Sequence, residues 1–210
     1  MILTILGAPG AGKGTLASAL SKELNLPSIS TGALLRDEIA SGSQLGKYID
    51  SLISEGNFVP DEMIVEMLSN RLKNEDCKRG YILDGFPRNK GQAEHLEDYG
   101  IKLTMALLLE ISDDLIISRL TGRRECSSCR KTYHIKDRPS KKEGICDVCG
   151  GTLRVRSDDD AEIIKKRLKI YHKETEPLIS FFEDKKLLTR VNASGSIEQT
   201  KTEAFKVLGV

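Results

Sequence analysis

A glycine-rich segment near the start of the chain, Gly7–Thr15, constrains the fold more than any other part of the sequence. It contains four glycines and a lysine, follows a short apolar run at Ile2–Leu6, and leads into leucines at helical spacing. A strand, a glycine-rich loop and a helix in this order are typical of a phosphate-binding loop. Glycine lets the backbone approach a ligand closely, and the N–H groups at the helix N-terminus then point toward an anion. The segment therefore predicts a nucleotide site in which Lys13 adds a positive charge.

The residue after Lys13 departs from the general motif, in which a serine or threonine follows and binds magnesium. Here Gly14 follows, and the hydroxyl group comes one position later, on Thr15. Direct binding of magnesium by this loop is therefore left open. The alternative is a glycine-rich turn without a ligand, which four glycines and a lysine at this spacing disfavour.

Length and composition indicate one main domain of an ordinary globular protein. The chain has 210 residues, of which 39% are hydrophobic and 30% are charged, so it can bury a core and still carry an inserted subdomain. The net charge of +1 favours neither a nucleic acid nor an anionic membrane as a partner. The pattern of a signal peptide and that of a membrane span are both lacking, so we expect a cytoplasmic protein with reduced thiols.

Apolar runs and helical patterns alternate along the chain. Strands that alternate with helices predict an α/β fold, with a mostly parallel sheet and helices on both faces. The expected strands are Ile2–Leu6, Ser28–Ser30, Tyr81–Leu83, Leu103–Leu109 and Leu187–Val191, and the expected helices include Asp61–Leu72, Asp113–Leu120 and Ile197–Leu208. The longest helix is expected from about Asp160 to Phe182, with a kink at Pro177.

Two regions interrupt this alternation and are interpreted as insertions at the rim of the sheet, where open α/β sheets bind their ligands. Residues 30–59 show two short helical patterns without a strand, and residues 122–158 are rich in cysteine, glycine and charge. The expected core therefore comprises residues 1–29, 60–121 and 159–210.

Four of the five cysteines form two Cys-x-x-Cys pairs, Cys126 with Cys129 and Cys146 with Cys149, separated by sixteen residues. This spacing is typical of a zinc ribbon, and four thiolates complete a tetrahedral site that has no open position for catalysis. We therefore expect a structural zinc ion, which supplies folding free energy that so small a segment lacks. Iron is the main rival metal, and disulfides or free thiols are the alternative without a metal. The nearby His134 is expected not to be a ligand.

The glycine-rich loop closely resembles that of adenylate kinases, and further motifs of that family follow along essentially the whole chain. These motifs are Ser30–Gly32 with Arg36, Asp84–Arg88 with Gln92, Gly122–Arg124, and Arg156–Asp159 with Arg167. In order, they resemble the nucleoside-monophosphate segment, the central signature, and the two ends of a long lid. The cysteines match the zinc-binding lid of bacterial members. The resemblance implies the P-loop nucleoside-monophosphate-kinase fold and reversible, Mg²⁺-dependent transfer of the γ-phosphoryl group of ATP to AMP, giving two ADP.

The resemblance also implies a role for each matching residue. Catalysis by alignment and charge neutralisation is implied for Lys13, Arg88, Arg123, Arg156 and Arg167. Contacts with ATP are implied for Gly10, Ala11, Gly12, Lys13, Gly14, Thr15, Arg119, Arg123, Thr132, Tyr133 and Gly195. Contacts with AMP are implied for Thr31, Arg36, Asn57, Phe58, Val59, Gly85, Phe86, Pro87, Arg88, Gln92, Arg156 and Arg167. Asp84 is the implied partner of magnesium through water.

Family analogy further implies a monomer whose two insertions close over the nucleotides and exclude water. Gln92 is expected to pair with the edge of the AMP adenine, and Arg119 to stack on the adenine of ATP. Three positions depart from the family pattern: Ala33 replaces an aspartate near the magnesium waters, Asn89 replaces a threonine, and Arg130 replaces a glycine.

Three other functions are alternatives to this one. UMP and CMP kinases are the nearest rivals, but they usually have a short lid. A GTPase requires Asp-x-x-Gly and Asn-Lys-x-Asp motifs, which Asp84–Pro87 and Asn89–Gln92 do not provide. A zinc-ribbon module that binds nucleic acid is the non-enzymatic alternative, because the lid is rich in lysine and arginine. Stacking aromatic residues are scarce there, with Tyr133 nearly alone.

Overall fold

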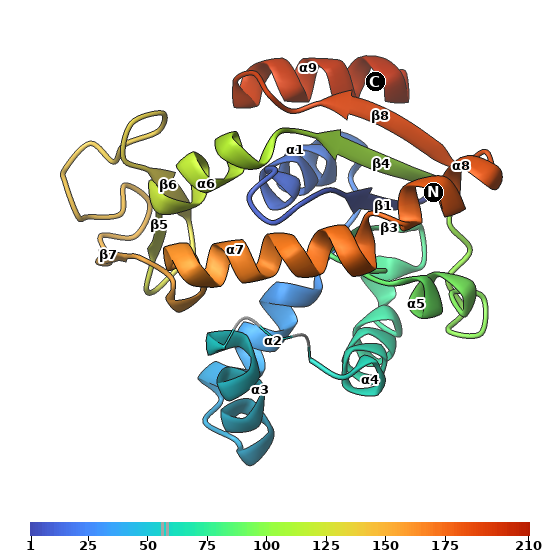
Figure 1. Ribbon diagram of the computed structural model, residues 1–210, viewed down its shortest axis with the longest axis horizontal. Coiled ribbons are helices and arrows are strands. Elements are labelled where there is room, and N and C mark those ends of the chain that lie inside the picture. Colours follow the sequence, from blue (N-terminus) through green and yellow to red (C-terminus); the bar gives the residue numbers. More distant parts are fainter. Residues whose placement is uncertain (56, 58) are drawn as a thin grey trace.

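The computed structural model describes residues 1–55, 57 and 59–210, which build a five-stranded parallel sheet at the centre of the molecule (Figure 1). The strand order is β2-β3-β1-β4-β8, with the first strand of the chain in the middle. The strands are β1 (Ile2–Leu6), β2 (Ser28–Ser30), β3 (Tyr81–Asp84), β4 (Met105–Glu110) and β8 (Leu188–Asn192). The predicted α/β class is confirmed, and the strand ends differ from the predicted ends by at most two residues.

Side chains of β1 alternate between the two faces of the sheet, and helices cover both faces. Leu3 and Ile5 pack with α1 (Lys13–Leu24) and α9 (Ile197–Leu208) on one face. Leu6 belongs to the core on the other face, beneath α4 and α8. The α-helices of the described chain other than α1 and α9 are α2 (Thr31–Ala40), α3 (Gln44–Ser54), α4 (Asp61–Leu72), α5 (Lys90–Glu94), α6 (Asp113–Thr121), α7 (Ala161–Ile170) and α8 (Leu178–Asp184).

The prediction of one continuous, kinked helix from Asp160 to Phe182 is wrong. A π-helical turn at Tyr171–Thr175 separates α7 from α8, and the N–H of Glu176 donates to the carbonyl of Tyr171 at 2.9 Å. Pro177 has no N–H to continue the ladder, and its ring clashes with the carbonyl one turn earlier, so the regular helix ends before it. The wide turn brings the hydroxyl of Thr175 within 2.6 Å of the carbonyl oxygen of Arg88.

The two segments predicted as insertions lie at different sides of the core in Figure 1. Residues 30–59 supply α2 and α3, which project together from the sheet, and residues 122–158 build a small antiparallel sheet of order β6-β5-β7. Its strands are β5 (Arg123–Cys126), β6 (Thr132–His134) and β7 (Leu153–Arg154). Two short 3-10 turns lie at Glu75–Cys77 and Ser157–Asp159.

Within the described part of the chain, no helix has both the length and the apolar character needed to cross a membrane.

The contact between α2 and α3 depends on a glycine. The backbone N–H of Gly46 donates to the hydroxyl of Ser43, which caps α3, at 2.8 Å. A Cβ on Gly46 would overlap the carbonyl oxygen of Glu38 in α2. The absence of a side chain therefore lets the two helix backbones come into close contact.

We predict that Gly46→Ala destabilises the protein, because the added methyl group must push α3 away from α2. The expected loss in the free energy of unfolding is about 1–3 kcal/mol, the usual cost of forcing extra atoms into a packed contact. Urea denaturation checks this, with Lys47→Ala at the next, exposed position as the matched control. Equal stability of the two variants would contradict the close-contact argument.

Candidate active site

The loop between β1 and α1 folds around its own lysine. Gly10 and Gly12 have φ angles of 87° and 100°, in the left-handed region that favours glycine. A Cβ on Gly10 would also lie 2.8 Å from a leucine side chain of α6. Lys13 Nζ donates to the carbonyl oxygens of Gly7 and Ala8 at 2.8 and 2.9 Å. The loop therefore holds a positive charge at its centre, at the N-terminus of α1.

Gly14 leaves room for a carboxylate beside this loop. Asp84 ends β3, which pairs with β1. A Cβ on Gly14 would lie 3.1 Å from Asp84 Oδ2, which is closer than nine in ten real Cβ contacts. The glycine that departs from the general motif thus lets Asp84 approach the N-terminus of α1, where its charge acts on Lys13.

Lys13 loses its proton at a pH much closer to neutral than an ordinary lysine does. Burial lowers the pKa of Lys13 from 10.5 to about 8, and the carboxylate of Asp84 opposes this shift. Arg88, Arg167 and Arg123 lower the pKa further because their positive charges lie nearby. Arginines from the loop after β3, from α7 and from β5 therefore converge on the phosphate-binding loop.

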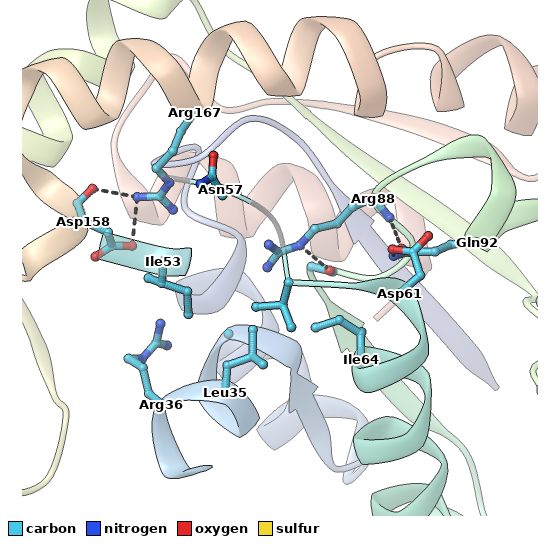
Figure 2. A pocket seen from close by; sticks show the side chains of 13 residues that line it. Leu35, Arg36, Ile53, Asn57, Asp61, Ile64, Arg88, Gln92, Asp158 and Arg167 are labelled. Atoms are coloured by element: carbon cyan, nitrogen blue, oxygen red, sulfur yellow. Dashed lines mark hydrogen bonds and ion pairs between the residues drawn. The ribbon is translucent and has the colours of Figure 1, made fainter. Parts of the chain in front are cut away.

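A hollow opens next to this cluster, between α2, α4, the loop after β3 and α7 (Figure 2). Figure 2 shows the guanidinium groups of Arg36, Arg88 and Arg167 directed toward it, with Gln92 at the opposite end from Arg167. The residues that line it are Gly32, Leu35, Arg36, Ile53, Asn57, Val59, Asp61, Ile64, Gly85, Arg88, Gln92, Asp158 and Arg167. Its apolar walls and cationic groups suit a ligand with a flat apolar part and an anionic end.

Carboxylates pair with the arginines around the hollow. Arg123 makes a two-pronged contact with the buried Asp159, with N–O distances of 2.7 and 2.5 Å. Arg167 pairs with Asp158 at 2.9 Å. Burial raises the pKa of Asp158, but the charges of Arg167, Arg123 and other arginines outweigh it and hold that pKa below its usual value. The acidic residues therefore keep like charges together at this edge of the sheet.

The same cluster extends to the lid and to α2. Arg156 forms an ion pair with the buried Glu125 of β5. Burial, followed by the nearby charge of Arg156, lowers the pKa of Arg36 to about 10. Thr31, at the start of α2, donates to the carbonyl of Gly85 at 2.9 Å and so ties the insertion to the end of β3.

Lid and insertion also touch each other directly. Arg130 of the lid forms an ion pair with Asp37 of α2, and its second Nη lies 3.4 Å from the carbonyl oxygen of Arg36. Arg130 has a φ of 59°, a left-handed value that costs a residue with a side chain. On the other side of the hollow, Lys166 of α7 donates to the carbonyl of Glu55 at 2.6 Å.

A second, smaller hollow lies on the other side of the phosphate-binding loop. It is lined by Ala11, Gly12, Thr15, Leu16, Arg119, Ile197, Thr200 and Lys201. Arg119 of α6, one of these residues, donates to the carbonyl oxygen of Gly195 at 2.8 Å. Two hollows therefore flank the loop, one on the side of the arginine cluster and one on the side of α9.

The four lid cysteines converge on one point. Their Sγ atoms all lie within 4.8 Å of one another, and two of the Sγ–Sγ distances are 3.4 and 3.5 Å. A disulfide requires about 2.05 Å, whereas thiolates around one zinc ion lie roughly 3.8 Å apart. The arrangement therefore fits a four-thiolate metal site and does not fit the disulfide alternative.

The family model described as adenylate kinase matches residues 5–187. Adenylate kinases of Caldicellulosiruptor saccharolyticus and Clostridioides difficile are 48% and 40% identical, and the matches cover 100% of this chain and 100% and 99% of those proteins. That of Thermodesulfovibrio yellowstonii is 47% identical, covering 95% of this chain and 94% of the relative. This chain belongs to the adenylate kinase family.

Membership confirms the predicted activity class. Adenylate kinases are nucleoside-monophosphate kinases that transfer a phosphoryl group between ATP and AMP and use Mg²⁺ with ATP, so ATP, AMP and ADP are the implied substrates and products. The UMP or CMP kinase and the zinc-ribbon module for nucleic acids are not favoured. The predicted P-loop kinase fold agrees with the sheet and the loop described above.

Some residues of the predicted adenylate kinase site have side chains that lie away from both hollows. Phe86 is fully buried in the core, and its carbonyl accepts from the hydroxyl of Thr4 at 2.7 Å. Tyr133 is buried in the lid, with its hydroxyl 3.3 Å from Cys146 Sγ. At these positions, contacts with a nucleotide must come from the backbone. Phe58 lies outside the described residues.

Sequence reasoning missed the acidic residues that organise the site. Asp61 contacts Gln92 and Glu125 contacts Arg156, and no role was predicted for either carboxylate. Asp158 and Asp159 belong to the predicted motif Arg156–Asp159, but their pairing with Arg167 and Arg123 was not predicted. A carboxylate near an arginine in space leaves no local sequence signal when the partner is distant along the chain. The pair Asp158-Asp159, which follows Arg156 after one serine, is the one local signal in the sequence.

We predict that ATP binding to this adenylate kinase takes up a proton near pH 8.5. The pKa of Lys13 in the free protein is about 8, and phosphate charges stabilise the protonated amine, so binding raises that pKa. Calorimetry in buffers of different ionisation enthalpy measures the uptake, which falls toward zero at pH 7, where Lys13 is already charged. Lys13→Met is expected to abolish it, and an unchanged uptake in that variant would contradict the assignment.

Proposed function

We propose that the hollow lined by Arg36, Arg88, Arg167 and Gln92 binds AMP and that the phosphate-binding loop with the second hollow binds ATP. The observation that carries this proposal is that Arg88, Arg123 and Arg167 converge on Lys13. Lys13 belongs to the loop that the two hollows flank. Two polyanions that meet there must be neutralised from both sides. This is the requirement for phosphoryl transfer between two nucleotides.

In this proposal, the chain contributes position and charge and no nucleophile. The N–H groups of Gly10–Thr15 cradle the ATP phosphates, and Lys13 follows the transferred group. Arg88 and Arg36 bind the AMP phosphate. Arg123, Arg156 and Arg167 neutralise the charge that develops during transfer, since a guanidinium can hold two phosphate oxygens at once.

The outer contacts of each nucleotide follow from the same arrangement. On the ATP side, Arg119 stacks on the adenine, and Gly195 and the backbone at Thr132 and Tyr133 supply further contacts. On the AMP side, the adenine edge meets Gln92, with the remaining contacts from Thr31, Asn57, Phe58, Val59, Gly85, Phe86 and Pro87. Their support is that Arg119 lines the second hollow and that Asn57, Val59, Gly85 and Gln92 line the first. The other positions are proposed from the family resemblance.

Asp84 is the proposed anchor for the Mg²⁺ that accompanies ATP, through water. Its carboxylate lies against Gly14 at the N-terminus of the loop helix, where the phosphates are expected, and this hard oxygen donor suits Mg²⁺. The ion supplies charge neutralisation on the phosphate oxygens. Ala33, which replaces the usual second aspartate, leaves Asp84 as the proposed anchor.

We further propose that the lid cysteines hold a structural zinc ion. The buried apolar core of the lid consists of Cys126, Tyr133 and Cys146, with Leu153 packed against it. So small a core cannot stabilise the segment, and the metal supplies the missing free energy. Four thiolates leave no position for a substrate, so the ion takes no part in the chemistry.

The remaining expectations join this proposal. We propose a monomer, because both nucleotide sites are complete within one chain, and no role for nucleic acid, because the lid has few aromatic residues for stacking. Residues 30–59 and 122–158 act as covers that close over the nucleotides and exclude water from the transfer. A cytoplasmic location is proposed because the four thiols must stay reduced to bind a metal.

The function is tested with ATP and Mg²⁺ and each of AMP, CMP, UMP and GMP, following ADP formation. We expect kcat/KM for AMP to exceed the others by at least about a hundredfold, since a site built to hydrogen-bond one base rejects the wrong pattern. Arg88→Ala is expected to lower this value strongly, whereas Arg79→Ala, at an exposed position, is its control. Equal turnover of all four acceptors would refute the AMP assignment.

Removal of the metal is expected to lower stability without stopping the reaction. An ion worth several kcal/mol to the lid should shift the melting temperature by roughly 5–15 °C when a chelator removes it. Activity at low temperature should persist. Cys149→Ser should lose the zinc measured by elemental analysis, and Ser128→Ala, at an exposed position between two ligands, should keep it. Loss of activity at a temperature where the chelated protein is still folded would refute a purely structural role.

A further inference from the structure

The amide of Gln92 is held in one orientation by two groups of opposite character. Gln92 lies in the middle of the short helix α5, at one end of the hollow, and is only 3% exposed. Its Oε1 accepts from the backbone N–H of Arg88 at 2.7 Å, and its Nε2 donates to Asp61 Oδ1 at 2.6 Å (Figure 2). A backbone N–H only donates and a carboxylate only accepts, so turning the amide over would break both hydrogen bonds.

Asp61 is itself fixed from a second side. It is the first residue of α4, and its Oδ2 accepts from Asn89 Nδ2 at 2.9 Å. The oxygen of the Asn89 amide accepts from the backbone N–H of Gln92 at 2.8 Å, which caps α5. The orientation of Asn89 is therefore fixed by the same logic, and both oxygens of Asp61 face an N–H donor.

The fixed amide leaves a defined pattern for a ligand. Gln92 keeps one unused N–H on Nε2 and one unused acceptor position on Oε1. The Watson–Crick edge of a 6-aminopurine presents an acceptor at N1 and a donor at N6, whereas a 6-oxopurine presents a donor at N1 and an acceptor at O6. An amide free to turn over can match either base. An amide held in one orientation matches one pattern and opposes the other.

We propose that Asp61 is a specificity-determining positioning residue, which holds the Gln92 amide in the orientation that accepts AMP and rejects IMP and GMP. This proposal rests on the proposed contact between Gln92 and the adenine of AMP. Asp61 acts through Gln92 and not on the base directly. The carboxylate is the essential feature, because it is the one side chain of this shape that accepts from two amide groups at once.

The decisive variant is Asp61→Asn, which keeps the size and shape of the side chain. Asparagine presents one acceptor and one NH₂ group, so it cannot accept from both Gln92 and Asn89, and one donor must face another donor. Turning Gln92 over relieves the conflict at position 61 but places its NH₂ group against the backbone N–H of Arg88, so neither orientation of the amide is favoured any longer. Glu62→Gln is the matched control, because it removes a charge from the same helical turn at an exposed position.

The measurement is the ratio of kcat/KM for AMP to that for IMP, with ATP as donor. In Asp61→Asn we expect this ratio to fall by about tenfold or more, with the KM for ATP unchanged, whereas Glu62→Gln keeps the ratio of the parent protein. A lost ratio with an unchanged KM for ATP distinguishes altered base reading from general damage. An unchanged ratio in Asp61→Asn would overturn the proposal.

Two further variants separate the possible causes. Asn89→Thr introduces a hydroxyl that can cap α5 but removes the amide N–H that reaches Asp61 Oδ2, so the contact of Asp61 with Gln92 remains and the ratio should stay within about twofold. A loss as large as that in Asp61→Asn would assign selectivity to the packing of α5 and overturn the role of the carboxylate. Gln92→Ala tests the underlying contact between Gln92 and the base. An unchanged ratio in Gln92→Ala refutes base reading by Gln92. A lowered ratio in Gln92→Ala, together with normal selectivity in Asp61→Asn, refutes only the proposal about Asp61.

Discussion

Repulsion among positive charges at the carboxyl edge of the parallel sheet is the constraint around which this adenylate kinase is organised. Lys13, Arg36, Arg88 and Arg167 all have pKa values lowered first by burial and then by neighbouring cations. Left alone, such charges would separate. Acidic residues at the end of β3, in β5 and in the 3-10 turn before α7 keep them in place, and so the charge that two nucleotides need at the proposed sites is assembled before either arrives.

This arrangement explains why three separate parts of the chain meet where they do. The order of the parallel strands brings the loop after β1 next to the end of β3, and Gly14 gives Asp84 the space to lie there. The π-helical turn that follows α7 is tied to the loop after β3, because Thr175 donates to the carbonyl of Arg88. The fold thus determines where Asp84 and the arginines lie relative to Lys13.

The parts of the structure that could be predicted from the sequence are those that depend on residues close together along the chain. The glycine loop, the strands and the Cys-x-x-Cys pairs each have a local pattern, and the resemblance to a family extended them along the whole chain. The π-helical turn was missed because it depends on Pro177 together with a distant partner of Thr175. Asp61 was missed because its partners lie about thirty positions further along the chain, with distances that only the folded structure provides.

The ion pair between Arg130 and Asp37 couples the position of the lid to that of the segment that contains α2. A left-handed residue with a side chain is strained by about 1–2 kcal/mol, and here that strain accompanies an ion pair between lid and α2. Any movement that separates lid from insertion must break this pair. If the two segments act as the proposed covers, a nucleotide that keeps one in place favours the closed position of the other, and thermodynamic reciprocity makes the effect equal in both directions. In that proposal, a single arginine on the surface couples the binding of donor and acceptor.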